Sequence, residues 1–392
     1  MPTLRDEFFV PTGWAYLAGN SLGLQPRAAQ AEVEAELAEW ARLGVEGWFE
    51  SREPWLEYAG SLRGAVARLV GASPDEVAVM NTLTVNLHLL LASFYRPTPE
   101  RFRILIEDTA FPSDSYAVQS QAAWHGLDPR EAVVRVPIAE LAEAIEDAGS
   151  SLAVALLPGV SYLSGEALDV VALTEAVHAV GAVAAWDLAH SIGNVPVSLH
   201  DADVDFAVWC HYKYVNGGPG APGGAFVHAR HGGRLDLPRL AGWWGNEPAE
   251  RFRMEPDFVP RPGAEGWAVS TPAVLAFAPL RAALEQFDRV GLDALRGRSL
   301  RLTAYLEELI DGVAEARPIA VATPREPGRR GAQLSVACDG ARSLARRLRD
   351  DHGVVCDFRE PDVLRFAPAP LYNTYEDCRR AAVGLLGVVE PR

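Results

Sequence analysis

The sequence predicts an α/β protein with a mostly parallel β-sheet covered by helices, followed by a smaller α+β domain. From about residue 77, short apolar runs alternate with helical stretches. These runs are almost continuously apolar, which is typical of strands buried on both faces. After about residue 272 the pattern changes to long helices followed by further strand-like runs. A length of 392 residues also favours two domains over one.

Two helices are predicted before the sheet. Residues 27–43 place Val33, Leu37 and Trp40 at helical spacing. A second helix is predicted near 54–70. Its inward residues are Leu56, Leu62, Val66 and Leu69.

The predicted strands are short. Those of the first sheet are VAVM, RILIE, AVVRV, LAVALL, AVAAW, FAVWC and GAFVH. Helices over 273–290 and 293–316 then precede the runs AQLSVAC, GVVCDF and VLRFAP, with the Arg-rich helix ARSLARRLRD between the first two runs. Residues 323–331 read as a surface loop. We therefore expect a large domain over 45–290, and a small domain built from 1–44 and 291–392.

Composition narrows the functional class. The net charge is −16, which argues against nucleic acid and anionic membranes as partners. The first residues show no signal-peptide pattern, and no run approaches the length of a membrane span. The four cysteines are scattered without metal-type pairing, so a reduced, cytoplasmic setting is expected.

One residue stands out by its rarity. Of the 36 basic residues, 35 are Arg and only Lys213 is Lys. Arg can replace Lys in most surface roles, but its guanidinium cannot form an imine with a carbonyl. Lys213 is therefore a candidate for chemistry that requires an amine, although it could also be an accidental remainder.

The neighbours of Lys213 favour the chemical interpretation. The strand AVAAW ends at Asp187, with His190 shortly after it, and the strand FAVWC leads to Tyr212 and Lys213. Ligands of open α/β sheets bind at the carboxyl ends of strands. Pyridoxal 5'-phosphate (PLP) needs an amine for its imine and a carboxylate for its ring nitrogen. Lys213 and Asp187 would supply both groups.

Other interpretations of these residues stay open. Asp187 could cap a helix, and the group His190, His200, Asp201, Asp203, Asp205 and His211 could be a solvated loop or a metal site. Upstream, Thr82 and Thr84 lie near the start of a helix that could receive a phosphate, or could simply cap it. In AFPSD, Phe111 could stack on a ring or lie in the core. Ser113 or Asp114 could contact the cofactor or cap the next helix.

Several segments, in order along nearly the whole chain, resemble kynureninase. They are YLAGNSLGLQP, MNTLTVNLHLLL, AFPSD, LLPGVSYLSGE, DLAHSIGNVPVSLHDADVDFAVWCHYKYVNGGPG, GWWGNE and RFAPAPLYN. The resemblance implies the fold-type I, aspartate-aminotransferase-like architecture and a homodimer with active sites at its interface. It further implies PLP-dependent hydrolysis of L-kynurenine to anthranilate and L-alanine, in tryptophan catabolism and the kynurenine pathway to NAD.

The resemblance also assigns roles to residues. The catalytic residues would be Lys213, Tyr212 and Asp187. The cofactor contacts would be Leu83, Thr84, Phe111, Pro112, Ser113, Asp114, Asp187, His190, Tyr212 and Lys213, with Trp243 and Thr271 from the partner subunit. The substrate contacts would be Arg365 for the α-carboxylate, Trp48 and Trp244 for the aryl ring, and Asn20 and Ser21. Taken alone, Arg365 could equally be a surface strand residue.

The resemblance extends to substrate choice. Family members that prefer 3-hydroxykynurenine tend to have His and Asn where this chain has Trp48 and Thr271, so plain kynurenine is expected to be preferred. The competing functions are another class V PLP enzyme, such as a cysteine desulfurase or an aminotransferase, a non-catalytic protein of the same fold, and a metal-dependent hydrolase.

Overall fold

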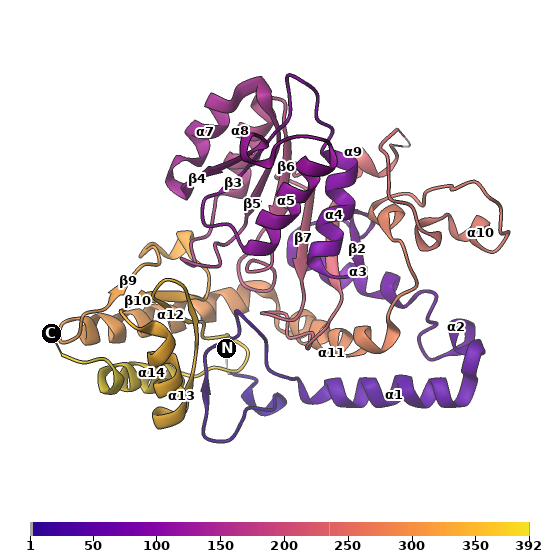
Figure 1. Cartoon of the computed structure of the whole chain (residues 1–392). Helices are drawn as coiled ribbons and strands as arrows, with labels where there is room; N and C mark the ends of the chain where they lie inside the picture. Colours follow the sequence, from indigo (N-terminus) through magenta and orange to yellow (C-terminus); the bar gives the residue numbers. More distant parts are fainter. Residues whose placement is uncertain (1–2, 235, 392) are drawn as a thin grey trace.

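The main sheet of the protein has the predicted α/β character (Figure 1). The computed structural model describes residues 3–234 and 236–391. Within them, seven strands lie in the order β2-β8-β7-β6-β5-β3-β4, and β8 alone runs against the other six. Their bounds are β2 Val77–Met80, β3 Arg103–Glu107, β4 Val133–Val136, β5 Leu152–Pro158, β6 Val183–Asp187, β7 Phe206–Cys210 and β8 Gly223–Val227.

Helices cover both faces of this sheet, which explains the continuous apolar runs. Alternate residues of a strand point to opposite faces. On β6, Trp186 therefore packs into one core and Ala185 into the other. The first core includes α3 Tyr58–Val70, α7 Leu141–Ala148, α8 Val170–Ala179 and α11 Val274–Val290. The second includes α4 Leu83–Phe94 and α5 Pro112–Trp124.

A smaller antiparallel sheet lies beside the main one, in the order β12-β13-β10-β9. Its core is shared with helices α12, α13 and α14. The N-terminal segment joins this part of the chain, because β1 pairs in parallel with β11. The bounds are β1 Ala15–Tyr16, α12 Leu292–Ala314, β9 Ala320–Val321, β10 Leu334–Ala337, α13 Ala341–His352, β11 Val354–Val355, β12 Asp357–Arg359, β13 Val363–Phe366 and α14 Tyr375–Val388.

Three local predictions need comment. The helix expected near 54–70 begins at Tyr58, because residues 54–57 form a turn in which Glu57 N donates to Pro54 O at 2.8 Å. The loop 323–331 is not wholly at the surface, since the buried Arg330 pairs with Glu307 of α12 at 2.7 Å. Helix α1, Arg27–Leu43, is confirmed, yet its Trp40 is 58% exposed. The apolar stripe of α1 is therefore not covered by this chain alone.

Helices of the described residues are all too short or too polar to cross a membrane.

A cross-strand contact fixes the approach of β7 to the site. Gly224 of β8 lies opposite Trp209 of β7, and a methyl group on Gly224 would overlap the indole ring. The indole Nε1 of Trp209 donates to His211 Nε2 at 2.9 Å, and His211 lies two residues before Lys213 in the chain. The chain that carries Lys213 is therefore held by a contact that only glycine permits.

Gly224→Ala should lower the free energy of unfolding by about 1–3 kcal/mol, because the indole must leave its position. Gly312→Ala is the matched control, because Gly312 lies exposed within α12 with open space around it. There the same change should be neutral or should stabilise by up to about 1 kcal/mol. Urea unfolding measures both variants, and equal effects would contradict the role given to the Trp209 contact.

Candidate active site

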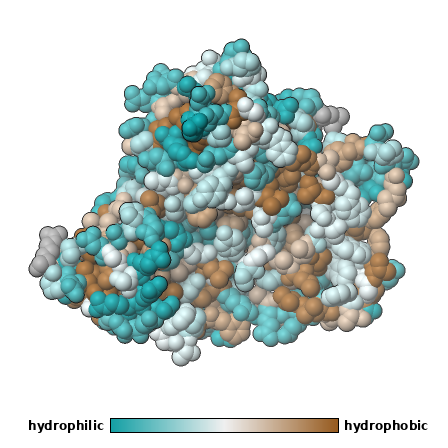
Figure 2. Space-filling model, viewed as in Figure 1, coloured by the Kyte–Doolittle hydropathy of each residue, from teal (hydrophilic) through white to brown (hydrophobic). Residues whose placement is uncertain are grey.

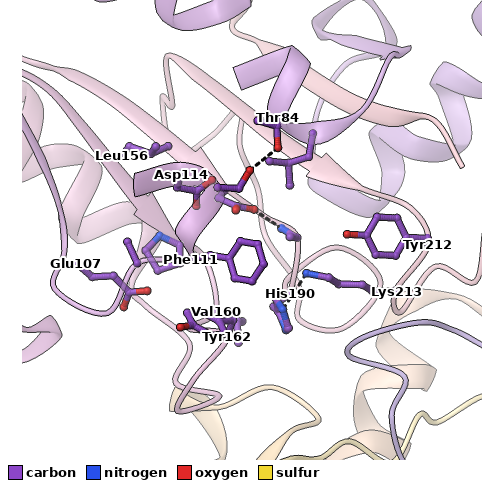
Figure 3. Close-up of a pocket in the computed structure, with 16 residues that line it drawn as sticks. Thr84, Glu107, Phe111, Asp114, Leu156, Val160, Tyr162, His190, Tyr212 and Lys213 are labelled. Carbon is purple, nitrogen blue, oxygen red and sulfur yellow. Dashed lines mark hydrogen bonds between the residues drawn. The ribbon is translucent and has the colours of Figure 1, made fainter. Parts of the chain in front are cut away.

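A cavity opens where β3, β5 and β6 end, beside the segment that follows β7 (Figure 3). This is the edge of the sheet at which the sequence predicted a site. Nine of the predicted residues line it, which are Leu83, Thr84, Phe111, Ser113, Asp114, Asp187, His190, Tyr212 and Lys213. Pro112 opens helix α5 between two of them.

Lys213 lies between an imidazole and two aromatic rings. Its Nζ is 2.9 Å from His190 Nε2, 5.8 Å from the centroid of Phe111 and 5.9 Å from that of Tyr212. Burial and the nearby Lys213 charge hold the pKa of His190 well below its usual range. His190 is therefore neutral and can accept a hydrogen bond from the lysine amine.

Two carboxyls face the same cavity. Asp187, the last residue of β6, accepts a hydrogen bond from Ala189 N at 2.6 Å. Asp114, on the first turn of α5, is 6% exposed, and its Oδ1 has no hydrogen-bond partner among the described residues. Burial, and then the neighbouring Asp187, raise the pKa of Asp114 well above its usual range. Asp114 therefore holds a proton more tightly than an isolated carboxyl does.

Two helix N-termini meet at the other end of the cavity. Helices α4 and α5 begin at Leu83 and Pro112, and neither has a side chain capping its first turn. The hydroxyls of Thr84 and Ser113 lie 2.6 Å apart. Gly223 backs this corner, and a Cβ there would meet Leu83 N at 3.0 Å. Helix N-termini and hydroxyl groups of this kind bind phosphate.

These features fit PLP as the cofactor. The amine of Lys213 can form the imine, the buried and unpartnered carboxyl oxygen beside Asp187 suits a protonated ring nitrogen, and the Thr84–Ser113 corner suits the phosphate. Phe111, 41% exposed in the protein alone, offers an aromatic face for the ring.

Arg365 lies beside the cavity and is 1% exposed, so the interpretation as a surface strand residue was wrong. Its Nη1 donates to the carbonyl of Tyr162, a cavity-lining residue, at 2.6 Å. Its Nε donates to Asp357 Oδ1 at 2.6 Å, and its Nη2 donates to Ser21 Oγ at 3.2 Å. The neighbouring strand β12, the loop after β5 and the N-terminal segment therefore hold the guanidinium in place.

Asn20 and Ser21 lie on the same side of the site as Arg365. Asn20 is fully buried and donates to Gln333 Oε1 at 2.8 Å, while its own Oδ1 has no partner among the described residues. The Ser21 hydroxyl also donates to Asp357. The N-terminal motif is thereby connected to Arg365.

The remaining predicted residues do not line this cavity within one chain. Trp48 and Trp244 have ring centroids 6.2 Å apart, and Trp243 packs edge-on against Trp244 at 5.4 Å. Thr271 and Trp244 line a second cavity together with Asn81 and Thr82. The aromatic group and the Lys213 cavity are thus separate in the single chain.

Sequence reasoning missed three residues, Glu107, Tyr162 and Asp357. Glu107 could have been found, because it ends the apolar run RILIE just as Asp187 ends VAAWD. Asp357 faces Arg365 only through the antiparallel register of β12 and β13, which the sequence does not reveal. Tyr162 lies in a loop after β5, and no periodicity marks it.

The His/Asp group divides between the two edges of the sheet. His190 belongs to the cavity, and buried His211 joins Trp209 Nε1 to the carbonyl of Pro222. Asp205 lies at the amino edge, where it accepts hydrogen bonds from Arg230, His231 and the backbone of Ala184. Asp201 and Asp203 bond to Ser198 and Arg230.

The cluster that comes closest to a metal site is Glu76, His200 and His228, whose donor atoms lie within 4.8 Å of one another. These atoms already have partners. Glu76 Oε1 bonds to His200 at 2.8 Å and to Ala229 N at 2.9 Å, and His228 Nδ1 accepts from Arg230 N at 3.1 Å. The group therefore links the segments before β2 and after β8 to the loop that carries His200.

Comparison with known proteins agrees with the sequence motifs. Residues 295–385 match the family model described as the kynureninase C-terminal domain. The kynureninase of Salinispora tropica is 57% identical over 387 residues, covering 96% of this chain and 90% of the relative. That of Myxococcus xanthus is 52% identical over 398 residues, covering 98% and 93%.

Solved structures agree on the fold. A cysteine desulfurase from Thermococcus onnurineus superposes with a TM-score of 0.82 at 17% identity, covering 99% of this chain and 98% of the other. A C-DES mutant with glycine covalently linked to its PLP cofactor gives 0.83 at 19%, covering 99% and 100%. The fold-type I architecture predicted from the sequence is confirmed.

Proposed function

The chain belongs to the kynureninase family, and we propose that it hydrolyses L-kynurenine to anthranilate and L-alanine, with plain kynurenine preferred over 3-hydroxykynurenine. Membership makes it a PLP-dependent hydrolase of carbon–carbon bonds. The observation that carries the proposal is the single lysine amine, which lies at hydrogen-bond distance from neutral His190 in a cavity that also holds Asp114 and Asp187. The bound cofactor supplies an electron sink for the substrate carbon that loses its proton.

Each residue then has a definite task. Lys213 holds the cofactor, and its amine, once released, takes and returns the proton at the substrate α-carbon. His190 stays uncharged and orients that amine through the 2.9 Å contact. Asp187 supplies the negative charge for the ring nitrogen, with Asp114 beside it.

Tyr212 is suited to donate a proton. Burial raises the pKa of its phenol, so the hydroxyl stays protonated at neutral pH. When the Cβ–Cγ bond breaks, the carbon that becomes the alanine methyl group needs a proton. A neutral phenol at the wall of the cavity can supply it.

Arg365 is proposed to bind the substrate α-carboxylate, since a guanidinium fork matches a carboxylate in shape and charge. Its present partner Asp357 neutralises it in the free protein and fixes its orientation. A carboxylate that enters would exchange contacts with Ser21 or the Tyr162 carbonyl, which are neutral and cost less to displace than Asp357.

We further propose a homodimer whose partner completes the site. Trp243 and Thr271 lie away from the Lys213 cavity of their own chain, as residues that serve the neighbouring cavity would. Figure 2 shows apolar surface at the lower right, over the region of α11. The exposed apolar residues on α1, the short helical segments Gly44–Glu46 and Gly47–Glu50 after it, and the start of α11 are Leu37, Trp40, Val45, Phe49 and Leu275. A patch of this kind marks an interaction surface.

The proposed reaction and its cofactor are tested with Lys213→Arg. The unmodified protein should show a visible cofactor band and should release fluorescent anthranilate from L-kynurenine. Without the amine, both the band and the activity should disappear, with a loss of at least about 10²–10⁴-fold in rate. Arg379→Lys, at an exposed position on α14, should change neither. A cofactor band without anthranilate would point to a different reaction in the same fold.

Substrate preference is tested by comparing kcat/KM for kynurenine and 3-hydroxykynurenine. The bulk of Trp48 and the absence of a polar partner for a ring hydroxyl should favour kynurenine by about 10- to 200-fold. The double change Trp48→His with Thr271→Asn should narrow or reverse that ratio, whereas Trp124→His, at a position 77% exposed, should leave it unchanged. A wild-type ratio that favours the hydroxylated substrate would overturn the proposed preference.

The dimer is tested with Trp40→Asp, measured by sedimentation. A charge in the centre of the apolar patch should separate the subunits and remove activity with them, because burying an unpaired carboxylate is costly. Leu386→Asp introduces the same charge at a residue 43% exposed on α14 and should leave a dimer. An active monomer in the first variant would contradict the shared site.

A further inference from the structure

Glu107 is a buried ionisable residue of the cavity that has no role in the reaction steps proposed above. It is the last residue of β3, is 1% exposed and lines the same cavity as Lys213 (Figure 3). Its Oε2 has no hydrogen-bond partner among the described residues. A buried carboxylate oxygen without a partner is costly, whereas a neutral carboxylic acid is much less so.

The groups around Glu107 are mostly acidic. Asp108 follows it on the chain, Asp187 lies at the end of β6, and Glu166 lies in the loop after β5. Asp114 of α5 and the phenol of Tyr162 also interact with it electrostatically. Against these, the Thr109 hydroxyl favours its ionised form. The acidic neighbours Asp108, Asp187 and Glu166 therefore disfavour a negative charge on Glu107.

Charge balance in the cavity leads to the same conclusion. Among its described lining residues, Lys213 is the one cation, because His190 is neutral, while Glu107, Asp114 and Asp187 are three acids. The phosphate of the cofactor adds further negative charge at the other end. If all three acids were ionised, the cavity would hold a large uncompensated charge out of water. Asp114 already holds its proton, and an ionised Glu107 would still leave two negative acids facing one lysine, with the phosphate beside them.

We propose that Glu107 is a positioning residue that remains a neutral acid in the working enzyme, so that the negative charge opposite the cofactor ring nitrogen rests on the Asp114–Asp187 pair alone. This role rests on the proposed use of PLP. It does not depend on which substrate is cleaved. Glu107 acts through the carboxyl pair and takes no part in bond breaking.

The pKa of Glu107 sets the pH above which the residue is no longer a neutral acid. Burial, and then the charges of Asp108 and Asp187, raise the pKa of Glu107 to about 8. Below that pH the folded protein keeps the proton, whereas the unfolded chain releases it near the ordinary value for glutamate. The stability gained by keeping the proton is therefore lost as the pH rises from that ordinary value towards 8. Above it, a second negative charge joins the carboxyl pair.

The test uses the holoenzyme and Glu107→Gln, which keeps the shape of the neutral acid. Asp108→Asn is the matched control, because it removes a like charge from the adjacent, exposed residue. Infrared difference spectra between pH 6 and 9 should show a protonated carboxyl that ionises near pH 8 in the wild type and at a lower pH in Asp108→Asn, but that is absent in Glu107→Gln. Above pH 8 the visible cofactor band of the wild type should respond to the charge that Glu107 gains, whereas the band of Glu107→Gln should show no such response.

Each possible result either supports the proposal or overturns it. Loss of the infrared signal together with loss of the visible response above pH 8 supports the proposal. An infrared signal that persists in Glu107→Gln would assign the proton to Asp114 and overturn it. Loss of the infrared signal with a visible response above pH 8 that persists in Glu107→Gln would show that Glu107 does not act on the ring-nitrogen site, and would also overturn it. Neither readout uses kynurenine, so failure of the proposed reaction is seen separately, as a cofactor band without anthranilate.

Discussion

The site depends on the adjacency of parallel strands β5, β6 and β7. Parallel neighbours end at the same edge, so Asp187 and Lys213, which are 26 residues apart in the chain, meet across one cavity. The cost is that several acids and one amine are concentrated where little water reaches. That cost explains the neutral His190 and the raised pKa values of Asp114 and Glu107. The electrostatics of the site therefore follow from the topology of the sheet.

The N-terminal segment connects this edge to the smaller sheet. Gly23 N donates to the carbonyl of Tyr212 at 2.8 Å, and a side chain on Gly23 would overlap the backbone of Lys213. Just before it, Ser21 bonds to both Asp357 and Arg365. One short stretch thus contacts the lysine on one side and the guanidinium on the other. The spacing between the two groups that would hold the cofactor and the substrate is fixed by that stretch.

Much of this arrangement could be predicted from the sequence, and the limits have physical causes. The strands were visible as apolar runs, and their ends located Asp187 and Lys213, because chain order and strand direction determine the edge. Asp357 was missed, since its contact with Arg365 arises from an antiparallel register set by tertiary packing. The apolar spacing that includes Trp40 correctly predicted helix α1. The spacing could not show that Trp40 is left exposed in the single chain.

The excess of Arg over Lys has a structural counterpart. Arg101 donates to the carbonyls of Leu152, Val180 and Gly181, joining the start of β5 to the end of α8. Arg298 likewise donates to the carbonyls of Pro370 and Asn373. Several backbone carbonyls can share one planar guanidinium, whereas a lysine amine offers three donors from a single point. Lysine would serve these positions less well, and arginine cannot form the imine that position 213 requires. The chain therefore uses its two kinds of cation differently. Guanidinium groups such as those of Arg101 and Arg298 bind chain segments together, whereas the amine of Lys213 is available for imine formation.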